Sequence, residues 1–185
     1  MPIVLVMTVL ARIGRIALIA VLVILTIRFA LSPLGRAAVG SFLHLPNLVF
    51  HEAGHVVFLP FGRFMNVLGG SLLQLVVPVV CAAAFLHQHG NRFACAVSVW
   101  WTGESLVDLA PYIADARALQ LPLLGGRTGA EVEGHDWEYL LTRLGLMSWD
   151  VALGRFAHFT GIVVMIAALA WAAALVVQRR EIDAQ

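Results

Sequence analysis

Residues 47–62 read NLVFHEAGHVVFLPFG, and this stretch decides what kind of protein the chain is. Apolar residues on both sides enclose three ionisable side chains, those of His51, Glu52 and His55. Ionisable groups inside a membrane helix are costly, and a cluster of them indicates a functional site. The stretch therefore predicts a membrane helix that carries chemistry.

The composition extends this interpretation to the whole chain. Of 185 residues, 61% are hydrophobic and only 12% are charged, whereas soluble domains carry about 25% charged residues. All 12 basic residues are arginine, and the net charge of +1 argues against a nucleic-acid partner. Two cysteines are too few for a disulfide scaffold. We expect an all-α integral membrane protein whose main partner is the lipid bilayer.

A membrane helix needs about 20 apolar residues, and the sequence offers about five such segments: 13–34, 41–59, 71–86, 93–111 and 151–177. The first has arginines near both ends and no small neutral residues after it, so we expect an uncleaved anchor rather than a signal peptide. Between the second and third segments, FGRFMNVLGG predicts a turn in which the Gly69–Gly70 pair breaks the helix.

The chain divides into four expected regions. They are a transmembrane anchor (1–40), a catalytic three-helix membrane core (41–117), a polar connecting segment (118–148), and a last transmembrane helix with a tail (149–185). The polar segment should form one short helix with Asp136 as its N-cap and Gly145 at its end. Five spans place the termini on opposite sides. Seven arginines against five put the N-terminus and the polar segment in the cytoplasm, with the protein in the plasma (inner) membrane.

The HEAGH pattern predicts a metal site. Residues four apart share one face of a helix, so His51 and His55 can direct two imidazoles at one ion. Glu52 beside them can act as the general base on a water molecule. This is the HExxH arrangement of zinc proteases, and it predicts Zn²⁺ as the cofactor.

A catalytic zinc ion needs a third protein ligand, and the sequence leaves several candidates open. GESLVD offers Glu104 with Asp108 four residues later, VDLAPYIADA offers Asp108 and Asp115, and GHDW offers His135 or Asp136. Depth along a straight helix favours Asp108, which lies about 10 Å deeper than Asp115. A helix break at the intervening proline would instead let Asp115 turn back toward the histidines.

The pattern resembles the site-2 protease family of intramembrane zinc proteases. That family carries HExxH in one membrane helix and, two helices later, a segment NxxPxxxxDG whose Asp is the third zinc ligand. Here DLAPYIADA stands at the corresponding place, with Asp108 at the Asn position, Pro111 at the Pro and Asp115 at the Asp. Ala116 replaces the Gly, and the gap from Pro to Asp is one residue shorter.

The resemblance covers about residues 46–117 and implies roles for three more side chains. Asp115 would be the third zinc ligand, and Asp108 would orient a histidine or bind substrate. The intervening GGSLLQLVVP resembles the glycine-rich helix start of the family, with Gln74 near its usual Asn, so Gln74 would likewise orient a metal ligand or bind substrate.

These features predict a membrane-embedded zinc endopeptidase that hydrolyses peptide bonds in or near transmembrane segments of other membrane proteins. The alternative is a metal-binding membrane protein without protease activity, such as a sensor, a carrier or an inactive scaffold. Glu52 favours the enzyme, because zinc binding alone does not need it.

Overall fold

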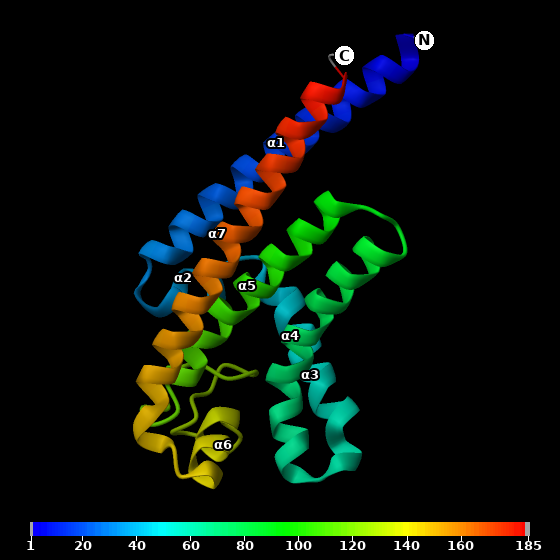
Figure 1. Ribbon diagram of the computed structural model, residues 1–185. Coiled ribbons are helices and arrows are strands. Elements are labelled where there is room, and N and C mark those ends of the chain that lie inside the picture. The colour runs from blue at the N-terminus through cyan, green and yellow to red at the C-terminus, as the bar shows by residue number, and fades with distance from the viewer. Residues whose placement is uncertain (1, 184–185) are drawn as a thin grey trace.

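The computed structural model describes residues 2–183, and its regular elements in that range are all helices, which confirms the expected all-α character (Figure 1). The α-helices are α1 (Pro2–Leu31), α2 (Arg36–Val39), α3 (His44–Phe58), α4 (Arg63–His87), α5 (Arg92–Ala114), α6 (Asp136–Leu144) and α7 (Asp150–Asp183). Three short 3₁₀ turns join them: Pro33–Gly35, Leu59–Phe61 and Met147–Trp149. The only β pairing in the described residues is an isolated bridge between Pro122 and Thr128.

Three of the described helical segments are long and apolar enough to cross a membrane: Val9–Leu31, Arg63–His87 and Met147–Gln178. They support the expectation of a membrane protein. The HEAGH helix α3 has 15 residues, or about 22 Å at 1.5 Å per residue, which is shorter than the hydrocarbon core of a bilayer. Helix α5 has 23 residues but carries Glu104 and Asp108 in its interior. Five full spans therefore remain a prediction.

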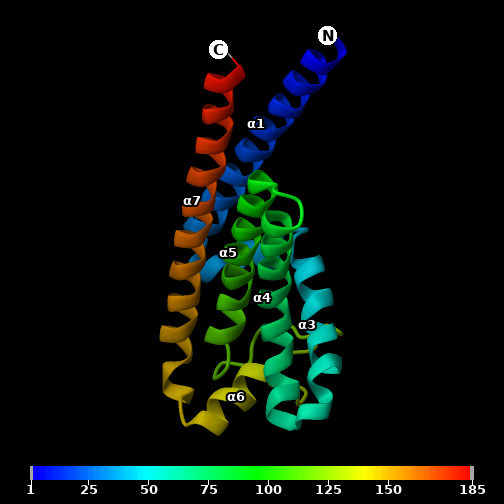
Figure 2. The same ribbon diagram turned by 45° about the vertical axis from the view of Figure 1, so that its right-hand side comes forward.

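Helices α1 and α3 run in the same direction, one after the other, beside α5. Along α1, the Arg15 guanidinium lies over the Phe93 ring near the start of α5, and Thr26 accepts a hydrogen bond from Trp100 further along it. Helix α3 continues beside the second half of α5, where the Asn47 side chain donates to a carboxylate. Both chain ends consequently lie at the same end of the molecule (Figures 1 and 2).

This arrangement of the described helices differs from the expected one, and the orientation in the membrane stays a prediction. The sequence interpretation placed the termini on opposite sides and put the N-terminus on the side of the polar segment. In the structure, the segment 118–148 lies at the opposite end of the molecule from the N-terminus (Figure 1). The reason is that α1 and α3 together make a single passage along α5 rather than two antiparallel ones. Gln185 itself lies outside the described residues.

Helices α5 and α7 form the closest long pair, and small residues allow the approach. A methyl group at Gly103 would lie 2.7 Å from the Gly161 carbonyl oxygen, and one at Gly154 would lie 2.7 Å from the Ala110 carbonyl oxygen. The two contact points are seven residues apart on each helix, or about two turns. Small residues at this spacing bring membrane helices into backbone contact. Helix α5 is thereby fixed as the central helix of the molecule.

The Gly69–Gly70 pair does not break the helix, contrary to the sequence interpretation. The turn is confined to the residues before Arg63, where Gly62 has a φ of 87°, and α4 runs without interruption through both glycines. They permit the close approach of α3, because a methyl group at Gly54 would collide with the backbone of Gly69. The two glycines therefore serve the close packing of α3 against α4 and do not reverse the direction of the chain.

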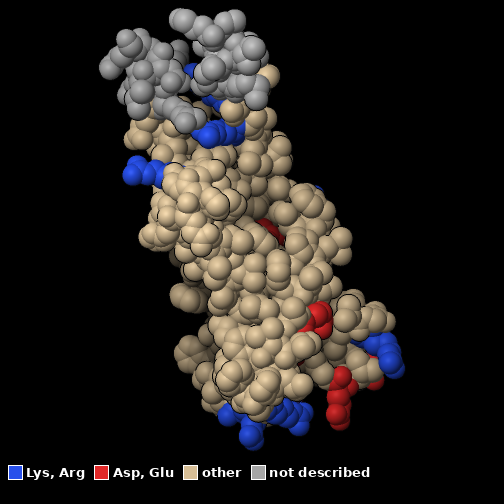
Figure 3. Space-filling view, turned by 90° about the vertical axis from the view of Figure 1, so that its right-hand side faces the viewer, with Lys and Arg blue, Asp and Glu red and all other residues tan. Residues whose placement is uncertain are grey.

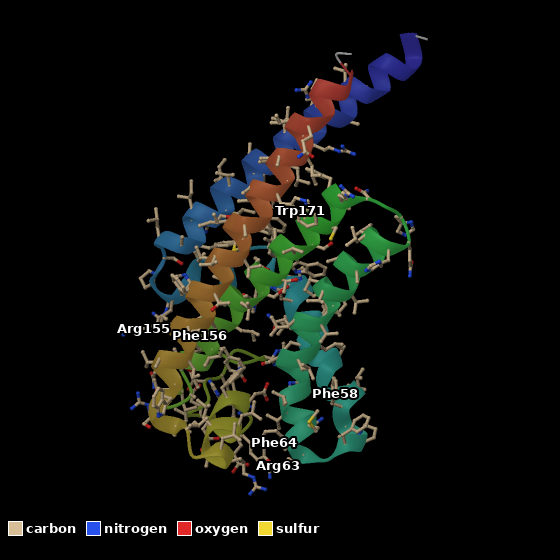
Figure 4. The ribbon with its side chains drawn as sticks, in the orientation of Figure 1. Phe58, Arg63, Phe64, Arg155, Phe156 and Trp171 are labelled. Atoms are coloured by element: carbon tan, nitrogen blue, oxygen red, sulfur yellow. The ribbon has the colours of Figure 1, made fainter. Side chains whose placement is uncertain are left out.

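The surface between the two ends of the molecule is apolar. In Figure 3 the charged side chains gather toward the two ends, and the middle of the visible face is almost entirely uncharged. Large hydrophobic side chains are exposed on α1, α3, α4 and α7. Arg63, labelled in Figure 4, lies at the end that carries α6, and its guanidinium lies 4.7 Å from the centroid of the Tyr139 ring. Such a surface suits a protein surrounded by lipid.

Candidate metal centre

The two histidines of HEAGH lie on one face of α3, as their spacing predicts. Their ring centroids are 5.0 Å apart, and both rings face α4 at Gly70. A methyl group at Gly70 would lie 2.7 Å from the Nε2 atoms of both His51 and His55. Only a residue without a side chain leaves room for the two nitrogens at this position.

The other nitrogen of each ring is held by α4. His55 Nδ1 lies 2.9 Å from the Asn66 carbonyl oxygen, which can only accept, so this nitrogen donates. His51 Nδ1 lies 3.1 Å from Gln74 Oε1. The amide of Gln74 is oriented by its Nε2, which donates to Asp108. Both Nδ1 atoms therefore carry hydrogen, and both Nε2 atoms face Asp136, where they can donate when protonated or bind a metal ion when deprotonated. Bonds of this kind orient the histidine ligands of metal sites.

Asp136 meets both Nε2 atoms. Its Oδ2 lies 2.8 Å from His51 Nε2 and 3.3 Å from His55 Nε2. One ligand atom from each of the three residues lies within 4.8 Å of the others, and we call them the His–His–Asp cluster. Burial would raise the pKa of Asp136, but the imidazoles of His51 and His55 outweigh it and hold the pKa below its usual value. Asp136 is therefore a carboxylate, the form that binds metal.

The chemistry of this cluster fits a metal ion. Once deprotonated, the two Nε2 atoms and the Asp136 carboxylate oxygen direct three lone pairs at one point, whereas a protonated imidazole donates to the carboxylate. Acceptors at 2.8 and 3.3 Å repel one another unless a proton or a cation lies between them. Two histidines and one carboxylate form a known ligand set of catalytic zinc, which leaves a fourth position open.

Glu52 follows His51 directly on α3 and is half-buried. Within the described residues its carboxylate has no hydrogen-bond partner. Its neighbour in the sequence, His51, belongs to the cluster, and no hydrogen bond in the described residues commits the Glu52 carboxylate to holding α3 in place. A carboxylate so placed is available to accept a proton from a group bound at the cluster.

Asp115, the third ligand that the family resemblance implied, lies elsewhere. Helix α5 continues through Pro111 without unwinding and ends at Ala114, with Asp115 as its C-cap. The two Asp115 carboxylate oxygens accept from the backbone N–H groups of Gln120 and Leu121 at 3.1 and 2.9 Å. Asp115 thus fixes the start of the polar segment, and Asp136, at the other end of that segment, reaches the histidines.

The polar segment delivers Asp136 through a short helix. Helix α6 begins at Asp136 and ends at Gly145 in the left-handed conformation, which confirms the predicted helix. The N-cap is His135 rather than Asp136, and His135 Nδ1 accepts from the Glu138 N–H at 3.2 Å. Since His135 takes the capping position, Asp136 is left for the cluster. Burial lowers the pKa of His135, and its Nε2 lies 3.6 Å from Asp115.

A buried polar network backs the cluster. Asp108, which is 4% exposed, accepts from Asn47 and Gln74, each at 3.2 Å, and lies 2.9 Å from His44 Nδ1. Through Gln74 it is linked to His51 and so orients that ring from a distance. Glu104 is fully buried and accepts from Asn47 at 2.8 Å. Neither Asp108 nor Glu104 belongs to the His–His–Asp cluster.

Two contributors were not anticipated from the sequence. Tyr112 accepts a hydrogen bond from the Asp136 N–H at 2.9 Å, and its ring lies 4.3 Å from that of His135 and 6.0 Å from that of His51. The second is His44, which pairs with Asp108. No local pattern marks either residue, because each acquires its role through a partner far away in the sequence.

Comparisons with protein-family models, curated proteins and solved structures find no match to this chain. The function proposed below therefore rests on the residues and the geometry of the site itself.

Proposed function

We propose that this protein is a zinc endopeptidase embedded in the plasma membrane, which hydrolyses peptide bonds in or near transmembrane segments of other membrane proteins. The observation that carries the proposal is the His–His–Asp cluster with Glu52 beside it. Two imidazoles, each held through its Nδ1 atom, and one carboxylate converge on a single point. Glu52 follows one of these histidines on α3, and its carboxylate has no hydrogen-bond partner among the described residues.

The proposed zinc ligands are His51, His55 and Asp136. The third ligand is revised from Asp115, because the Asp115 carboxylate is occupied by two backbone N–H groups. Asp136 was one of the candidates in GHDW, and it is the one that reaches both Nε2 atoms. Gln74 and the Asn66 carbonyl group act behind the histidines by holding their rings in position.

The chemistry divides among residues of this chain. When bound, zinc would polarise a substrate carbonyl group and lower the pKa of a water molecule toward about 7. Glu52 accepts the proton of that water and later delivers it to the leaving amine. Gly70 keeps the space in front of the two Nε2 atoms open.

The location of the cluster indicates the class of substrate. Helix α3 carries the site and exposes apolar side chains along its outer face, including Val49 at 64% and Val56 at 73%. A substrate helix can therefore approach through the bilayer along apolar surface. Because peptide groups inside a helix are shielded by their own hydrogen bonds, the substrate must unwind locally before hydrolysis.

The test combines metal analysis with a cleavage assay on purified protein in detergent, using single-span membrane proteins as substrates. Glu52→Gln should keep about one zinc ion per chain but lose hydrolysis, because glutamine has the size of glutamate without its basicity. Asp136→Asn should lose zinc, whereas Asp115→Asn should retain more of it.

Three outcomes would count against the proposal. Unchanged zinc content in both His51→Ala and His55→Ala would exclude the metal site. Normal turnover by Glu52→Gln would exclude its role as general base. Zinc binding by the wild-type protein without hydrolysis of any membrane-protein substrate would favour a sensor, a carrier or an inactive scaffold.

A further inference from the structure

A second polar site lies away from the His–His–Asp cluster, beside the turn between α4 and α5, where α1, α5 and α7 meet (Figure 1). It is a cavity of about 440 Å³, a volume within the range of small-molecule sites. The residues that define its chemistry are Arg15, His89, Asn91, Arg92, Phe93 and Gln178. We call it the arginine cavity.

The arginine cavity is basic and has no acidic residue in its lining. Among the described residues, neither Arg15 nor Arg92 forms an ion pair with a carboxylate. The Arg15 guanidinium is placed 5.1 Å from the centroid of the Phe93 ring, which orients the charge by a cation–π contact. Figure 3 shows basic side chains without acidic ones among the described residues near this end of the visible face. An anion is the ligand that such a lining attracts.

The start of α5 adds to the positive potential. Asn91 is the N-cap of this 23-residue helix and accepts from the Ala94 N–H at 3.1 Å. The N-terminus of a helix carries a partial positive charge of about half a unit. Arg92 and Phe93, the first two residues of α5, both line the cavity. The N-terminus of α5 and the two guanidinium groups therefore both favour an anionic ligand.

The position of the cavity along the helices distinguishes a lipid from a soluble anion. Arg15 lies before the apolar run 16–27 of α1, and Gln178 ends the apolar segment of α7. His87 ends α4 and Arg92 begins α5 at the same end of the molecule. The apolar segments of α4, α5 and α7 therefore end beside the cavity, whereas α1 continues past Arg15 as helix. The end of three apolar segments is the level expected for lipid headgroups.

We propose that the arginine cavity binds the phosphate-bearing headgroup of an anionic phospholipid. Arg15 and Arg92 contact the phosphodiester, and the acyl chains extend along the exposed apolar face of α1 toward the other side of the bilayer. Basic pockets between membrane helices bind anionic lipid headgroups in this way. The proposal is independent of zinc binding and of hydrolysis.

The experiment measures thermal unfolding of the full chain in nonionic detergent during titration with phosphatidylglycerol. A ligand that binds the folded state raises the melting temperature in proportion to its occupancy. We expect a rise with phosphatidylglycerol and none with phosphatidylcholine or inorganic phosphate. Arg15→Gln and Arg92→Gln should each weaken the apparent affinity about fivefold. Arg127→Gln, in the polar segment at the other end, is the matched control and should behave as wild type.

Each other outcome overturns the proposal. Equal shifts with phosphatidylcholine would mean that lipid is bound without regard to charge. A full shift with inorganic phosphate alone would assign the cavity to a free anion. An unchanged affinity in Arg92→Gln, an exposed position whose loss leaves the Arg15–Phe93 contact intact, would show that the cavity does not hold the headgroup.

Discussion

Gly70 shapes the metal centre by having no side chain. Its hydrogen atoms occupy the place where a methyl group would lie 2.7 Å from both histidine Nε2 atoms. Gly70→Ala should therefore lower zinc occupancy at least about tenfold, a loss of the size seen when the surroundings of metal ligands are disturbed. Metal analysis after mild chelation measures it. Gly40→Ala, where the nearest atom would be 3.9 Å away, is the control, and equal zinc content in both variants would contradict the prediction.

Tyr112 holds the third ligand in place through a single hydroxyl group. Tyr112→Phe removes the acceptor of the Asp136 N–H and leaves that donor without a partner. An unsatisfied donor costs about 1–3 kcal/mol, so zinc affinity should fall about 5- to 150-fold. Competition with a chelator of known affinity measures the change. Tyr139→Phe keeps the ring under Arg63 and should leave zinc affinity unaltered; an equal loss there would argue for a general effect on folding.

At the scale of elements, the fold depends on how closely α5 and α7 approach. A methyl group at Gly161 would lie 2.5 Å from the Gly103 carbonyl oxygen and 2.7 Å from a Val107 methyl carbon. Overpacking costs about 1–3 kcal/mol, so Gly161→Ala should lower the melting temperature. Gly14→Ala in α1, with no atom within 4 Å, should leave it the same or raise it, since alanine favours helix over glycine. A melting temperature for Gly161→Ala at or above that of the wild type would contradict this packing.

At the scale of the whole molecule, the parallel course of α1 and α3 decides the topology. Both chain ends lie at one end of the structure, and the cluster lies toward the other. Reporter fusions at the two termini should therefore give signals on the same side of the membrane. A fusion within the loop at Gly125–Gly126 should report the opposite side. Signals from the termini on opposite sides would restore the arrangement of five full spans.

The sequence by itself determined the features that depend on near neighbours. The apolar composition indicated a helical membrane protein, because lipid leaves backbone groups no partners except those within the helix. The i, i+4 spacing of His51 and His55 predicted their shared face, because helical periodicity is fixed within one turn. The end of α6 at Gly145 was likewise predictable from the sequence, because the left-handed conformation that Gly145 adopts is strained for most other residues.

Only the tertiary structure decided which carboxylate meets the histidines. Asp136 is 85 residues from His51 in the sequence. No local pattern favours it over Asp115, which lies within the segment that resembles the site-2 protease motif. The choice depends on the packing of α6 against the N-terminal half of α4. It also depends on the two backbone N–H groups that donate hydrogen bonds to the Asp115 carboxylate. The Gly69–Gly70 pair shows the same limit. Sequence reasoning marks such a pair as a helix break, whereas the close passage of α3 keeps it helical, because contacts between helices outweigh the low helix propensity of glycine.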